Sequence, residues 1–122
     1  MSEFGRRIRP YVEREILAAY HADAEGKPEV AFSHLERAHI LGQTSTVEHV
    51  LVHWHMFLWS IRQSDVRECL GQLLRIIGAS IGTVLGLVPQ GNTGGTNMNP
   101  FKSIPIPPDL AALIEKARTS EG

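Results

Sequence analysis

Five of the six histidines in this chain lie between Phe32 and Ser60, and this stretch constrains the fold more than any other. Its pattern is that of a helix, a tight turn and a second helix. The five residues are His34, His39, His49, His53 and His55. Their spacing indicates that some of them meet across the turn.

The turn between the two helices is marked by local sequence signals. Gly42 is typical of the left-handed residue that ends many helices, because it has no Cβ. Ser45 and Glu48 have the spacing of a capping box that starts the next helix. One helix is therefore expected to end near Leu41 and the next to begin at Thr46, which makes the two helices antiparallel neighbours.

In such a hairpin, residues equally far from the turn face one another. His39 then lies opposite His49, and Glu36 lies roughly opposite His53. Glu36 and His39 are three residues apart and His49 and His53 are four apart, so each pair shares one helix face. Three imidazoles and one carboxylate suit a divalent transition metal. The sequence predicts a metal site made of these four side chains, with zinc first and iron, copper or nickel as alternatives.

The apolar residues of both helices predict which faces are buried. The expected stripes are Ala31, Leu35 and Ala38 on the first helix and Val47, Val50, Trp54 and Ile61 on the second. The four proposed ligands then lie on the flank of the helices, ordered and still reachable. His34 and His55 point away from this flank. Met56 is either a soft ligand that favours copper or ordinary packing.

A simpler interpretation of the same residues is that they bind no metal. A single helical histidine is more often a non-ligand, and a Glu–His pair three residues apart can be a plain hydrogen-bonded pair. The matched positions of two pairs across one turn favour the metal site over this alternative.

The composition excludes several classes of function. The chain has 122 residues, which predicts a single domain over 1–122, and its net charge of −1 offers no basic excess for nucleic acid. Its one cysteine, Cys69, excludes an internal disulfide and any thiolate-cluster site within one chain. The arginine-containing start has no apolar run behind it, and residues 76–89 are too short for a membrane span. We expect a cytoplasmic protein.

Helical periodicity extends through most of the chain. Helices are predicted from Pro10 to about Glu25, from Pro28, from Thr46, after Ser64 and Asp65, and over Asp109–Thr119. The small residues Ala19, Gly26, Ala31 and Ala38 have nearly the spacing of one tetratricopeptide repeat, without a second copy. The predicted fold is all-α, a four-helix, tetratricopeptide-like bundle of antiparallel hairpins with a short terminal helix.

The fourth predicted helix has two distinct faces. Its expected buried stripe is Val66, Leu70, Leu73, Leu74, Ile77, Ile81, Val84 and Leu85. Another face carries Gly71, Gly78 and Gly82, which indicates close approach by a helix of the same chain or by a symmetric partner. Gln72 and Arg75 lie near this face and are expected to hydrogen-bond across the contact.

Residues 86–108 form a Gly- and Pro-rich segment without helical or strand period. The run Gly91–Gly95 resembles a phosphate loop only superficially, since it lacks the Gly-Lys-Ser/Thr that opens a helix after a strand. We expect an irregular loop packed on the bundle, with Asn92 and Thr93 turned inward. The sequence assigns the 91–95 loop no function.

Several motifs together resemble a known family. They are Leu35–Gln43, His49-Val50 followed by His53 and Met56, Gly71–Arg75, and Gly91–Gly95 after Val88-Pro89. On these the chain resembles the small bacterial family DUF3703 over nearly its whole length. The resemblance implies a stand-alone helical protein with an association to metal-handling gene neighbourhoods, and it brings no established activity. Glu36, His39, His49, His53 and Asn92 match family-like positions.

Three functions follow from these patterns. The first is a transition-metal-binding protein for metal homeostasis or sensing. The second is a metal-free helical module that forms a homodimer or docks a partner through the glycine face. The third is a metal-dependent enzyme, which ranks last because no general acid or base stands out beside the ligands.

Overall fold

The structure is a computed structural model that describes residues 2–85 and 105–119, with side chains described for 2–78 and 105–119. The described residues form helices and no strands. The helices are α1 (Glu3–Ala24), α2 (Pro28–Gly42), α3 (Thr46–Arg62), α4 (Val66–Leu85) and α5 (Pro108–Arg118). The all-α prediction is therefore confirmed.

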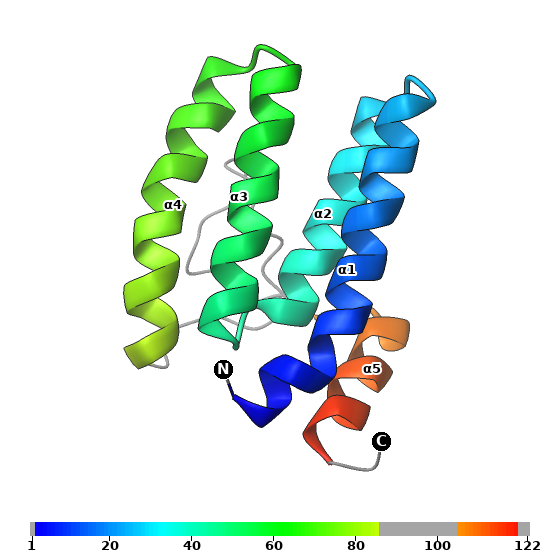
Figure 1. Ribbon diagram of the computed structural model, residues 1–122, viewed down its shortest axis with the longest axis vertical. Coiled ribbons are helices and arrows are strands. Elements are labelled where there is room, and N and C mark those ends of the chain that lie inside the picture. The colour runs from blue at the N-terminus through cyan, green and yellow to red at the C-terminus, as the bar shows by residue number, and fades with distance from the viewer. Residues whose placement is uncertain (1, 86–104, 120–122) are drawn as a thin grey trace.

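Two antiparallel hairpins lie side by side (Figure 1). One is α1 with α2 and the other is α3 with α4, while α2 and α3 join them and α5 packs on α1 and α2. The largest buried apolar side chains come mainly from the first hairpin and the inner face of α3: Ile8, Val12, Leu35, Leu41, Val52, Met56 and Leu110. The buried stripe Ala31, Leu35 and Ala38 of α2 is confirmed.

The first helix begins earlier than its sequence pattern predicts. Ser2 is the N-cap residue, and its hydroxyl accepts a hydrogen bond from the Gly5 amide at 2.9 Å. Pro10 therefore lies inside α1 and not at its first turn, so the prediction of a start at Pro10 is wrong. Proline lacks the amide that would bond to the preceding turn. Figure 1 shows the first turns of α1 bent away from the rest of the helix.

The two glycines at the hairpin turns act for different reasons. Gly26 has φ +75° and ends α1 in the left-handed region, where a Cβ is disfavoured. Gly42 does not have a positive φ, so its predicted left-handed role is wrong. A Cβ on Gly42 would lie 2.8 Å from the Cβ of Glu48. The residue is glycine because α2 and α3 approach closely there.

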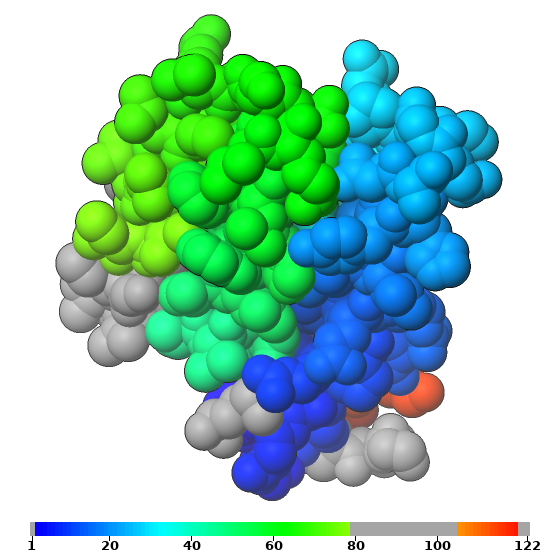
Figure 2. Space-filling view, turned by 45° about the horizontal axis from the view of Figure 1, so that its top comes forward, coloured from blue at the N-terminus to red at the C-terminus, as the bar shows by residue number. Residues whose placement is uncertain are grey.

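Most described residues of the apolar stripes predicted to be buried on α3 and α4 are instead exposed. On α3, Val47, Trp54 and Ile61 are 46% to 52% exposed, whereas Val50 is half-buried. On α4, the described residues of the stripe are 45% to 72% exposed: Val66, Leu70, Leu73, Leu74 and Ile77. Figure 2 shows the α3–α4 hairpin as a broad outer surface of the molecule. The faces that meet inside this hairpin are largely polar, because hydrogen-bonded side chains occupy them.

The remaining sequence expectations are only partly covered by the described residues. A Cβ on Gly78 would meet no atom within 4 Å, so no described helix approaches this glycine. The expected loop with Asn92 and Thr93 lies outside the described residues, apart from residues 105–107 that lead into α5. Among the described helices, none combines the length and apolar character needed to cross a membrane.

Candidate metal centre

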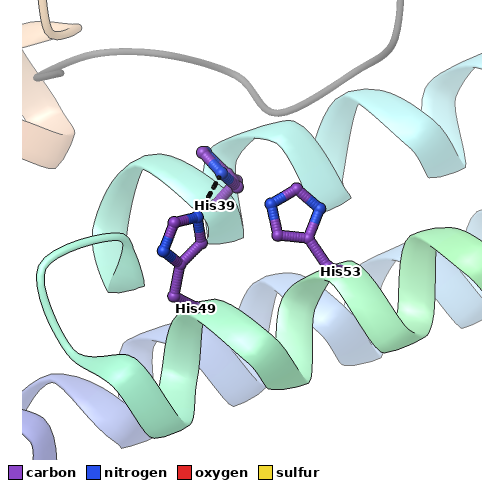
Figure 3. Close-up of side chains that lie close together, drawn as sticks. All are labelled: His39, His49 and His53. Carbon is purple, nitrogen blue, oxygen red and sulfur yellow. Dashed lines mark hydrogen bonds between the residues drawn. The ribbon is translucent and has the colours of Figure 1, made fainter. Parts of the chain in front are cut away.

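Three of the four predicted ligands meet at the α2–α3 turn (Figure 3). His39 lies in the last turn of α2, and His49 and His53 lie on successive turns of α3. One ring nitrogen from each of the three lies within 4.8 Å of the others. The ring centroids are 4.7, 4.8 and 5.0 Å apart, which is nearly an equilateral triangle.

All three imidazoles are buried. Their exposed fractions are 3%, 6% and 2% for His39, His49 and His53. The Nε2 atoms of His39 and His49 are 3.0 Å apart, so one ring donates a hydrogen bond to the other. The three rings therefore converge on a shared interior point, away from bulk solvent.

The turn places His39 opposite His49 without the predicted capping box. Ser45 is the N-cap of α3, and its side chain makes no capping hydrogen bond. Its amide instead bonds to the Gly42 carbonyl at 2.9 Å. Glu48 is fully buried and accepts a hydrogen bond from Arg9 Nε at 2.7 Å. The capping box is wrong because Arg9 of α1 offers this carboxylate a charged partner in the interior.

A hydrogen-bond chain from α4 sets the protonation of His53. Gln72 Nε2 donates to Glu68 Oε1 at 2.8 Å, which identifies the other side-chain atom of Gln72 as the oxygen. That oxygen lies 2.5 Å from His53 Nδ1, so Nδ1 carries the hydrogen and donates it. The Nε2 atom of neutral His53 then carries no hydrogen, and its lone pair can bind a metal.

Burial keeps the imidazoles of α3 neutral. The pKa of His49 is lowered to about 3. Desolvation by burial is the larger cause, and the electrostatic effect of the nearby His53 is the smaller one. Desolvation also lowers the pKa of His53 to about 4, although the hydrogen bond to Gln72 acts in the opposite direction. Both rings are therefore neutral at pH 7, which is the protonation state that binds a metal ion.

The fourth predicted ligand is not part of this group. Glu36 is half-buried on α2, one turn before His39, and its carboxylate is not among the atoms within 4.8 Å of one another. His34 pairs with Glu15 at 2.8 Å, and His55 contacts the Tyr20 hydroxyl at 2.9 Å. Both were expected to point away from the site, and they do.

Two further residues near the site have roles that the structure defines. Met56 is fully buried in the apolar core, which agrees with the packing alternative of the sequence analysis. Gln72 is also fully buried, and it hydrogen-bonds to His53 of the neighbouring helix α3, which is one of the two contacts expected for it. The signal for this role was the four-residue spacing of Glu68 and Gln72, which places both on one face of α4.

A family model matches residues 6–114 of the chain, and its description is "Protein of unknown function (DUF3703)". The chain belongs to the DUF3703 family. The match includes α2, α3 and α4, so the histidine group and its Gln72–Glu68 support all lie within the family domain. No curated protein and no solved structure matches the chain.

Proposed function

We propose that this DUF3703 protein binds a divalent transition metal between α2 and α3, through His39, His49 and His53. The convergence of three buried imidazoles supports this function more than any other observation. A metal held by three imidazoles would use all three rings at the point where they meet.

The spacing of the rings suits a small ion. A tetrahedral zinc site with metal–nitrogen bonds of ~2.0–2.1 Å has nitrogen–nitrogen edges of ~3.3 Å. The His39 and His49 nitrogens are 3.0 Å apart, and the whole group lies within 4.8 Å, so small side-chain rotations reach this geometry. Metal binding would displace the proton of the hydrogen bond between His39 and His49. This proton would move to another ring nitrogen or to solvent.

Glu36 is the fourth ligand in this proposal. It lies three residues before His39 on the same face of α2, so a change of its side-chain rotamers brings a carboxylate oxygen toward the three rings. Three imidazoles and one carboxylate suit zinc, and they also accept iron, copper or nickel. A closed four-ligand site is typical of storage or sensing more than of catalysis, which keeps an open position.

The biological role that we propose is metal homeostasis or sensing. The three histidines come from two helices joined only by residues 43–45, and Gln72 links the group to α4. Metal occupancy would therefore stabilise the contact between the two hairpins. A protein with this coupling reports or buffers a metal ion without needing a substrate.

The test is metal binding by the tag-free protein after treatment with a chelator. We expect one equivalent of zinc to bind in a calorimetric titration, and elemental analysis to retain it after dialysis. The variant with His39, His49 and His53 all changed to Gln is expected to lose this binding. The control with His34→Gln and His55→Gln is expected to keep it. Uptake below about a tenth of an equivalent of zinc, iron, copper and nickel would refute the proposal.

A further inference from the structure

The outer surface of the α3–α4 hairpin carries a set of exposed apolar side chains, here called the apolar seam. Its members on α4 are Val66, Leu70, Leu73, Leu74 and Ile77, and those on α3 are Val47, Trp54 and Ile61. Each is 45% to 72% exposed. A group of exposed apolar side chains of this size on a folded domain is typical of an interaction surface.

Helical geometry places both parts of the seam on one side of the hairpin. His53 of α3 contacts Gln72 of α4, and Trp54 and Leu73 each follow one residue later. One residue is a rotation of ~100° about the helix axis. Because the helices are antiparallel, the same rotation from their contact leads to the same side. Trp54 and Leu73 therefore face one surface.

The spacing along α4 suits another helix as the partner. Val66, Leu70, Leu73 and Ile77 are separated by four, three and four residues, which is the spacing of a heptad seam. The opposite side of α4 is already occupied by Glu68 and Gln72, which bond within the hairpin. The apolar side is therefore not needed for the packing of α4 on α3.

We propose that the apolar seam is the interface of a symmetric homodimer. All eight members are uncharged, so a two-fold contact of the seam with itself brings no like charges together. Eight half-exposed side chains at roughly 100 Å² each supply about 800 Å² per protomer, the area of a standard stable interface. Two hairpins paired this way form a four-helix arrangement with a closed apolar interior.

The test is the solution mass of the full-length protein, measured by sedimentation equilibrium over a concentration series. We expect a dimer for the unchanged chain. Leu70→Glu introduces one charge from each protomer into the apolar interface and is expected to weaken the dimer at least about 100-fold. Leu17→Glu is the matched control, because Leu17 is 61% exposed on α1 and Leu70 is 59% exposed. The control is expected to remain dimeric.

Three outcomes would overturn the proposal. The first is an unchanged chain that stays monomeric at every concentration, which would mean that another protein or another part of this chain covers the seam. The second is a dimer that persists in Leu70→Glu. The third is an equal loss of dimer in both variants. Circular dichroism of each variant verifies that Leu70→Glu remains helical, so that loss of the dimer reports the interface and not unfolding.

Discussion

Gly42 and Glu48 touch so closely that a Cβ on Gly42 would lie 2.8 Å from the Cβ of Glu48. This contact joins the end of α2 to the start of α3, three residues after His39 and one residue before His49. It therefore determines how near the two imidazoles come. Their Nε2 atoms are 3.0 Å apart, next to this contact of the two helix ends.

Gly42→Ala is expected to destabilise the protein by about 1–3 kcal/mol, because the new methyl group overfills a packed contact. Gly78→Ala is the matched control. A Cβ at Gly78 meets nothing within 4 Å, so this change is expected to raise stability by up to ~1 kcal/mol through helix propensity. Urea unfolding of both variants measures the difference. A Gly42→Ala variant as stable as the unchanged chain would contradict the close contact.

His53→Ala is expected to reduce metal affinity by at least about 100-fold, since losing a ligand costs no less than losing its supporting hydrogen bond. His55→Ala is the control on the same helix, because its ring contacts Tyr20 and not the other histidines. Competition with a chromogenic chelator gives both affinities. Equal metal affinities in the two variants would show that His53 is not a metal ligand.

Gln72→Leu is expected to lower metal affinity about 10- to 100-fold, because the His53 ring loses the acceptor that orients it. Gln63→Leu serves as the comparison, since Gln63 is exposed at the end of α3. The same chelator competition measures this effect. If Gln72→Leu binds as tightly as Gln63→Leu, the hydrogen bond to Gln72 does not support the site.

The metal-free protein is expected to lose stability as the pH falls from about 6.5 toward 4. The pKa of His53 is about 4 in the folded chain, against 6.5 for an ordinary histidine, and that of His49 is about 3. Between these values the unfolded chain binds more protons than the folded chain, so acid favours unfolding. For His53 alone, the free energy of unfolding falls by ~3 kcal/mol when the pH drops below both pKa values. Above the ordinary pKa there is no such loss.

Urea unfolding at several pH values measures this dependence. His53→Gln is expected to reduce the slope of stability with pH, because glutamine takes up no proton. His21→Gln is expected to keep the slope, since His21 is exposed on α1. A slope that is the same in both variants would show that burial of His53 does not couple to proton uptake.

The positions of the helix ends around the site were predicted from residues close in sequence, although Gly42 and the pair Ser45 and Glu48 do not act there as predicted. The end of α2, the start of α3 at Thr46 and the start of α4 after Asp65 were predicted from residues close in sequence. Asp65 accepts a hydrogen bond from the Glu68 amide at 3.0 Å. The pairing of His39 with His49 also followed, because a short connection forces its flanking helices to be antiparallel neighbours.

Contacts between distant residues could not be predicted in this way. Arg9 is 39 residues from Glu48. No local pattern indicates that the Glu48 carboxylate binds Arg9 and does not cap α3. Likewise, only the packing of α4 on α3 brings Gln72 to His53. The group of converging side chains in the described residues contains three histidines, whereas the pattern predicted Glu36 as a fourth member.

The sequence by itself determined where α2 and α3 meet and that His39, His49 and His53 share one end of a hairpin, since these features depend on spacing and turn length. Only the tertiary structure decided which faces of α3 and α4 are buried. Helical period reveals an apolar stripe, but it does not reveal whether that stripe or the polar face opposite packs inside. Here the polar face is inside, because its histidine, glutamine and glutamate side chains satisfy one another through hydrogen bonds.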